Sequence, residues 1–379
     1  MSFSAVLSRP AGGTDVPEST DADDGLRVLC DVAHPAQAHL FRNALAELER
    51  RGHTTFVTSR EKEVTVPLLD AHDIEHLPLS TRGESLPELL VELGVRERRL
   101  FAVARQFDPD VILSRLGPAP AHASALQGCR HVVVSDTSID STPMRLVRHT
   151  ATLPFVDTVC APPEMELPVS EEQRRALPVQ ELAYLHPRYF DPDPSVLRSL
   201  GVDPEERFFV VRTAGWDAYH DIGHSGLSAA TLRELTATLS EHGRVFVSAE
   251  GTVPASMPAE PLDVPTADVH DVLHYADLYV GDSGTMSTEA AVLGTPAIRT
   301  NSMVGTDDEV VFKRLEHQYG LLESYADDTE ALGAVDRLLS SGLESDRWEQ
   351  RRQRLLAEQP DVTERIVETV LATTTVTHQ

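Results

Sequence analysis

The sequence has few cysteines, very few lysines and no long apolar run, and each shortage excludes a class of protein. The three cysteines are far apart, at Cys30, Cys129 and Cys160, so neither a disulfide framework nor a zinc cluster is expected, and a reducing cytoplasm fits. No apolar run approaches the roughly 20 residues that a membrane helix requires. The N-terminus has no basic stretch followed by an apolar one, so no secretory signal is expected.

Positive charge is also scarce. The chain has 33 basic and 60 acidic residues, a formal charge of −27, and only Lys62 and Lys313 are lysines. Such a surface repels nucleic acid. It suits either a strongly basic partner or a halophilic, archaeal type of cytoplasm, in which molar salt screens the acids. Because the acidic residues are spread along the whole chain, we favour the second interpretation.

What the chain does contain is an alternation of β-rich and helical patterns. Over 379 residues, 41% of them hydrophobic, strands are predicted at 26–33, 53–59, 110–114, 131–136, 157–162, 207–214, 244–250, 277–284 and 295–300. Alternation with helices predicts an α/β fold with parallel sheets. Prolines gather at 162–195 and indicate a connection between two domains.

These patterns predict four parts of the chain. They are a disordered acidic tail over 1–24, an N-terminal Rossmann-like domain over 25–185, a C-terminal Rossmann-like domain over 186–360, and a terminal helix over 361–379. A return of that last helix to the N-terminal domain is one option.

The segment GDSGTMSTEAAVLGTPAIR (281–299) carries the most specific chemical signal. A predicted strand ends at Val280, a small-residue turn follows, and a helix begins near Thr285. The N–H groups and dipole at such a helix start suit a phosphate or diphosphate. The candidate ligands are Ser283, Gly284 and Thr285. Glu289, about one turn into the helix, is placed either to accept two ribose hydroxyls or only to complement the helix dipole.

This segment resembles the nucleotide-binding segment of GT-B glycosyltransferases. It is similar to that of the peptidoglycan N-acetylglucosaminyltransferase, and UDP-N-acetylglucosamine 2-epimerase is a further relative that shares the fold. The segment is closer still to a family of predicted archaeal and bacterial glycosyltransferases with the pattern GTMxxEAAxLGTPAI, which residues 284–298 nearly reproduce. Residues 31–53 follow that family's DxxxPPHVHFFxxLxxELExRGH pattern. VSDTSID (134–140) and VVRTAGWDAYHD (210–221) extend the resemblance over nearly the whole chain from Leu26.

The resemblance implies two Rossmann-like domains facing a cleft, with a UDP-sugar donor on the C-terminal half and the acceptor on the N-terminal half. It implies no cofactor and no metal. Arg212 would clamp the diphosphate, and Glu250 and His270 would flank the nucleotide base. Placement on a helix surface is the alternative for His270.

The family's paired histidines fall on Gln37 and His39, so only the second is kept. Because the resemblance places the loop after the first strand beside the sugar, His39 is the first candidate for the general base, and His34 is the second. Either could instead cap or pack a helix. Asp136, at a strand end, could orient the histidine, act as the base itself, or serve as a turn residue.

Two stretches, 86–106 and 144–149, are basic and apolar in an otherwise acidic chain. They suit peripheral contact with an anionic membrane face or a lipid-linked acceptor, or they are ordinary helix faces. The favoured function is an inverting glycosyltransferase acting in glycan or glycolipid synthesis. The alternatives are a non-hydrolysing UDP-sugar 2-epimerase and a catalytically silent nucleotide-sugar-binding protein.

Overall fold

The computed structural model describes residues 16–17, 25–83, 85–136, 150–203, 206–213, 226–249, 257–305, 308–343 and 345–375. The tail predicted over 1–24 therefore lies, except for two residues, outside the described part. The chain forms two compact units. One contains Met1–Tyr184 together with Asp361–Gln379, and the other contains Leu185–Pro360.

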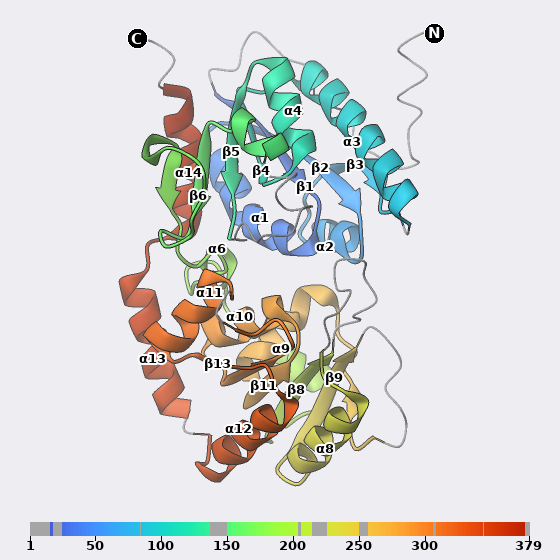
Figure 1. Ribbon diagram of the computed structural model, residues 1–379, viewed down its shortest axis with the longest axis vertical. Helices are drawn as coiled ribbons and strands as arrows, with labels where there is room; N and C mark the ends of the chain where they lie inside the picture. Colours follow the sequence, from blue (N-terminus) through green and yellow to red (C-terminus); the bar gives the residue numbers. More distant parts are fainter. Residues whose placement is uncertain are drawn as a thin grey trace. The chain divides into compact units, whose positions relative to one another are not determined.

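The first unit is a parallel sheet with helices on its two faces (Figure 1). Its described strands are β1 (Arg27–Val32), β2 (Thr54–Glu61), β3 (His76–Thr81), β4 (Val111–Arg115), β5 (Arg130–Val134), β6 (Thr158–Ala161) and β7 (Arg174–Ala176). Its described helices are α1 (Pro35–Arg50), α2 (Thr65–Ala71), α3 (Leu86–Phe107), α4 (Pro118–Gln127) and α14 (Val362–Thr375), and the short α6 (Leu182–Leu185) lies at the boundary with the second unit.

The second unit repeats this plan. Its described strands are β8 (Phe208–Thr213), β9 (Arg244–Ala249), β10 (Glu260–Pro261), β11 (Leu278–Gly281), β12 (Ala297–Thr300) and β13 (Leu322–Tyr325). Its described helices are α7 (Ser195–Ser199), α8 (Ala229–Ser240), α9 (Val269–Tyr275), α10 (Gly284–Leu293), α11 (Val310–Lys313), the π-helical turn Arg314–Tyr319, α12 (Asp328–Ser340) and α13 (Ser345–Glu358).

The strand order determines where ligands can approach each sheet. In the first unit the order is β3-β2-β1-β4-β5-β6-β7, and in the second it is β10-β9-β8-β11-β12-β13. All the pairs are parallel. The direction of winding therefore reverses between β1 and β4 and between β8 and β11. Ligands of open α/β sheets bind outside the carboxyl ends of the strands at such a reversal.

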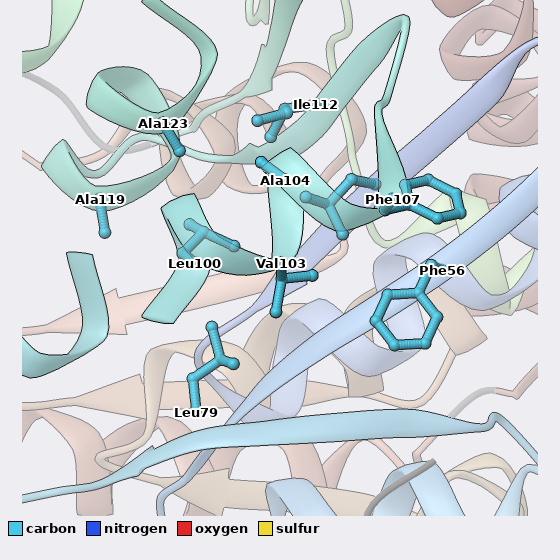
Figure 2. Packing of buried hydrophobic residues seen from close by; sticks show 10 residues of the cluster. Phe56, Leu79, Leu100, Val103, Ala104, Phe107, Ile112, Ala119 and Ala123 are labelled. Atoms are coloured by element: carbon cyan, nitrogen blue, oxygen red, sulfur yellow. The ribbon is translucent and has the colours of Figure 1, made fainter. Parts of the chain in front are cut away.

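The second half of α3 anchors that helix to the first sheet. Leu100, Val103, Ala104 and Phe107 recur at helical spacing and pack on Phe56 of β2, Leu79 of β3, Ile112 of β4 and the start of α4 (Figure 2). All are almost completely buried, and a buried Leu or Phe side chain contributes about 1.5–3 kcal/mol. The first half of α3 lacks this packing, a difference that matters for the pocket described below.

The C-terminal helix α14 belongs to the first unit and packs against α1. The Thr363 hydroxyl donates to the Ala183 carbonyl at 2.8 Å, and Arg51 donates twice to the Glu364 carboxylate, at 2.6 and 2.8 Å. The buried Ile366, Val367 and Val370 supply the apolar face of the helix. The chain thus returns to its first unit after completing the second.

Candidate functional site

In the second unit, Arg212 and the predicted residues Ser283, Gly284 and Thr285 lie at the strand-order reversal. Arg212 lies in β8 and is the register partner of Gly281 in β11, so the two strands present their carboxyl ends side by side. The amide of Asp282 continues this pairing by donating to the Arg212 carbonyl at 3.3 Å. The Arg212 side chain donates to the Ser248 hydroxyl on β9 at 3.1 Å. The topology therefore brings Arg212 beside the loop that begins α10.

Helix α10 starts directly after this loop. Ser283 is its N-cap, and the Ser283 hydroxyl accepts a hydrogen bond from the Met286 amide at 3.4 Å. The hydroxyl keeps its own proton for donation to a ligand. The amides of Gly284 and Thr285 lie in the first turn, where helix geometry offers no acceptor within the helix, and Thr285 is exposed. This end of α10 is thus equipped to bind an anion.

Two glycines allow the close packing beneath the helix start. A Cβ on Gly281 would lie 2.5 Å from the Tyr279 hydroxyl and 2.8 Å from the Arg212 carbonyl. A Cβ on Gly284 would lie 2.9 Å from Cζ of Phe312. That ring is held on its other side by the buried guanidinium of Arg299, 3.6 Å from the ring centroid, and Arg299 pairs with Asp308. The residues beneath the loop are therefore closely packed against it.

Glu289 and His270 meet inside the unit. The His270 Nε2 lies 3.0 Å from the Glu289 Oε1, and both side chains are buried. The alternative that His270 lies on a helix surface is therefore wrong, because α9 turns it toward α10. The contact engages one Glu289 oxygen within the protein. Glu250, the remaining predicted nucleotide ligand, lies outside the described residues, as does the loop at 214–225.

The first unit holds a pocket at its own strand-order reversal. The pocket measures about 280 Å³. It is lined by Asp31 of β1 and Ala33 after it, Gln37 of α1, Arg60 of β2, the first half of α3, Arg115 at the end of β4, and the following residues through Pro120 in α4. Arg96 of α3 donates to the Asp31 carboxylate at 2.6 Å and to the Ser59 carbonyl at 3.1 Å. Arg60 donates to both oxygens of Glu92, at 2.6 and 2.5 Å.

Glu92 is a buried carboxylate in the wall of this pocket. Burial alone raises the pKa of the Glu92 carboxyl, but hydrogen bonds from Arg60, the Gly83 amide and the Ser80 hydroxyl outweigh burial and leave this pKa below its usual value. Glu92 is therefore charged at neutral pH and holds the Arg60 guanidinium in a fixed orientation.

Two predicted catalytic residues lie at the same edge of the first sheet. His34 is the N-cap of α1, and its Nδ1 accepts from the Ala36 amide at 3.3 Å. Burial lowers the pKa of His34 to about 4, and Lys62 adds to the shift against the opposing effect of Glu63. Its imidazole is thus neutral at pH 7. Asp136 follows β5 and pairs with Arg115 and Gln180.

The expectation for His39 needs correction. His39 lies inside α1, not on the loop after β1, and it is 6% exposed. Its ring stacks on Tyr184 with 5.2 Å between the ring centroids and meets His72 edge-on. It is not among the pocket-lining residues, whereas Gln37, where the resembled family has its other histidine, is. The helical phase turns position 37 to the pocket and position 39 to the core.

The arginines of the basic stretch in α3 also differ in where their side chains lie. Among the α3 arginines, Arg96 points into the pocket, Arg98 and Arg105 are exposed, and Arg99 donates to the Leu79 carbonyl at 2.6 Å. Residues 144–149 lie outside the described part of the chain.

Sequence patterns did not identify Arg60, Glu92 or Arg115 as pocket residues, because no local motif marks them. Only the sheet topology brings together residues that are about 30 positions apart. Among the described residues, no group of three or more His, Cys, Asp or Glu side chains is arranged to hold a metal ion. No helix in the described ranges is both long and apolar enough to cross a bilayer.

Two parallel α/β units with this strand order define a pair of Rossmann-like domains, the architecture of GT-B proteins. Residues 26–373 match the family model described as "Protein of unknown function (DUF354)", and the chain belongs to that family.

Known proteins resemble this chain, in sequence or in structure, over nearly their full lengths. A curated relative, "Uncharacterized protein MJ0665" of Methanocaldococcus jannaschii, is 22% identical over 333 residues, covering 82% of this chain and 94% of its own. The solved "S. aureus MnaA-UDP co-structure" has a TM-score of 0.67 at 12% identity, covering 93% of this chain and 98% of its own. The "Spinosyn Forosaminyltransferase SpnP" has a TM-score of 0.62 at 16% identity, covering 93% and 100%.

Proposed function

We propose that the protein is a nucleotide-sugar-dependent glycosyltransferase, with a UDP-sugar as the donor. One observation carries the proposal: Arg212, the Ser283 cap and the open first turn of α10 lie at one edge of the second sheet. That edge is the strand-order reversal, where α/β sheets bind ligands. The names of two proteins with similar structures, a UDP co-structure and a sugar transferase, agree with this choice.

The chemistry divides between the two units. The α10 amides and Ser283 bind the donor diphosphate, and the Arg212 guanidinium stabilises the negative charge that grows on the departing nucleotide. The first unit binds the acceptor, whose hydroxyl must lose a proton during an inverting transfer. His34 and Asp136 lie at the carboxyl edge of that unit's sheet and are the candidates for this base. The transfer requires no cofactor in this scheme.

Direct binding of UDP tests the donor site. Isothermal titration in molar KCl should give a 1:1 complex with UDP, and Arg212→Gln should weaken binding by about 1.5–3 kcal/mol because a charge-assisted hydrogen bond is lost. Arg233→Gln, on the exposed surface of α8 in the same unit, is the matched control and should bind as the wild type does. Equal affinities for wild type and Arg212→Gln would remove Arg212 from the site.

A UDP-sugar 2-epimerase is the second candidate. It is favoured by similar solved structures that are named as UDP-N-acetylglucosamine 2-epimerases, which have TM-scores of 0.60–0.64 and 11–16% identity. Incubation with a panel of UDP-sugars, with and without acceptors, separates the two. Epimerisation without any acceptor would identify an epimerase, and transfer to an acceptor would identify a transferase. UDP binding without turnover in any mixture would identify a nucleotide-sugar-binding protein.

A further inference from the structure

Helix α3 has two halves with different surroundings. Its second half is buried in the core shown in Figure 2. Its first half exposes large apolar side chains: Leu90 is 64% exposed, Val91 is 67% exposed and Leu93 is 38% exposed. Leu93 also lines the 280 Å³ pocket. Leu90 lies three residues before it in the same helix, so apolar side chains continue from the exposed surface to the pocket.

The pocket holds three guanidinium groups in a strongly negative chain. Each one is fixed in advance by a carboxylate: Arg60 by Glu92, Arg96 by Asp31 and Arg115 by Asp136. Arg60 donates to Glu92 through Nε and Nη2, and the described residues give its Nη1 no hydrogen-bond partner. Such preorganised guanidinium groups suit a phosphate.

The start of α4 adds to this environment. Gly117 is the N-cap of α4 and provides no side chain for capping, and it lines the pocket with Pro118, Ala119 and Pro120. The positive end of a ten-residue helix therefore faces the same space as the arginines. Because Gly117 has an extended backbone, with φ −167°, and a Cβ there would meet nothing closer than 3.9 Å, a side chain can be introduced without strain.

We propose that this pocket binds the phosphate of an acceptor carried on an apolar chain, with the exposed first half of α3 in contact with that chain or the membrane around it. The inference rests on the proposed transferase function and names the class of its acceptor. The remaining guanidinium donor of Arg60 and the positive end of α4 select the phosphate. The continuous apolar surface from Leu90 to Leu93 selects a lipid-linked phosphate rather than a soluble one.

The test measures association with vesicles in about 1 M KCl, where surface charges are screened but partly buried ones much less so. Flotation compares phosphatidylcholine vesicles that contain hexadecyl phosphate with vesicles of phosphatidylcholine alone. The wild type should associate only with the first kind. Inorganic phosphate, added as a soluble competitor, should displace the protein only partly, because it cannot replace the apolar contact.

A pair of variants at one position isolates the pocket. Gly117→Asp places a carboxylate beside the three arginines and should reduce association by about tenfold or more through like-charge repulsion and competition for the guanidinium groups. Gly117→Asn has the same shape without the charge and should bind as the wild type does. Both residues are good N-caps, so both variants should fold at least as well as the wild type.

A second pair isolates the apolar face. Leu90→Asp combined with Val91→Asp should abolish flotation, and Arg98→Gln, on the exposed side of the same helix, should leave it unchanged.

Three results would overturn the proposal. They are equal association with both kinds of vesicle, equal association of Gly117→Asp and Gly117→Asn, and binding of inorganic phosphate that Gly117→Asp removes while flotation persists. UDP titration of the same variants separates failure of this proposal from failure of the proposed transferase function. Gly117→Asp should bind UDP normally, because the donor residues lie in the other unit.

Discussion

At the scale of single residues, His34 is half-buried at the start of α1. Its side chain is 41% exposed, and the partial loss of solvent, with the nearby Lys62, lowers its pKa to about 4, so that the imidazole is neutral at pH 7. We expect His34→Ala to lower turnover by about 10²–10⁴-fold with little change in UDP affinity, because a general base acts in the transition state and does not contact the nucleotide. Steady-state kinetics and UDP titration of the same preparation measure the two effects.

The buried histidine of α1 provides the control for this prediction. His39→Phe keeps a ring to stack on Tyr184 and should retain nearly normal turnover. If His39→Phe loses turnover and His34→Ala does not, the earlier assignment to His39 is restored. If neither variant loses turnover, Asp136 becomes the base candidate, and Asp136→Asn is the variant to measure.

His131 provides a pH-dependent part of the stability. It is completely buried, its Nε2 lies 2.9 Å from the Ser114 hydroxyl, and burial lowers its pKa to about 4. Between the unfolded pKa of about 6.5 and the folded value, only the unfolded chain binds the proton. The contribution of His131 to the free energy of unfolding is therefore fully present above pH 6.5. It is lost as the pH falls from 6.5 to 4, and the loss amounts to about 3 kcal/mol.

Denaturant unfolding at several pH values and constant salt measures this slope. His131→Gln retains a hydrogen-bonding group toward Ser114 but cannot titrate, so its stability should fall less steeply between pH 6.5 and 4. Parallel curves for the two proteins would show that His131 does not contribute to the slope.

At the scale of elements, the start of α10 depends on the space beneath it. Gly284→Ala should cost about 1–3 kcal/mol of unfolding free energy, because its Cβ would press on Phe312, which Arg299 holds in place. It should also weaken UDP binding by displacing the first turn. Gly333→Ala in α12 meets nothing within 4 Å and should stabilise the protein by about 0.5–1 kcal/mol. Urea unfolding compares the two glycine substitutions, and equal effects would contradict the packing argument.

The central strands were predictable and the edge strands were not. The runs at 26–33, 110–114 and 277–284 each contain a short apolar stretch, as expected for strands buried on both faces, and they correspond to β1, β4 and β11. The sequence patterns missed β3, which contains Pro78, and β13, which is only four residues long and polar at its centre. Both lie at sheet edges, where packing imposes less pattern on the sequence.

At the scale of the whole molecule, the net charge of −27 determines how the stability should depend on salt. We expect the melting temperature to rise from low salt to molar KCl, because unscreened repulsion among acidic residues opposes the folded state. Circular dichroism across a salt series measures this. A melting temperature that stays constant or falls would contradict the halophilic interpretation.

The two candidate sites differ in how many of their residues local sequence patterns could predict. The proposed donor residues Ser283, Gly284 and Thr285 form one continuous segment, so a local pattern was enough to select them as candidates. The proposed acceptor pocket combines Asp31, Arg60, Glu92, Arg96 and Arg115, which come from four separate elements. Their proximity follows from the order β2-β1-β4 and from the placement of α3, which no local pattern encodes.

The return of α14 to the first unit has a consequence for synthesis. The second unit, Leu185–Pro360, is a continuous segment, but the first unit needs Thr363 and the apolar face of α14 to complete its packing. As the chain leaves the ribosome, N-terminal domains ordinarily finish folding first. Here the unit whose translation begins first stays incomplete until residues 361–375 have been made, and the face of α1 that packs against α14 is exposed until then.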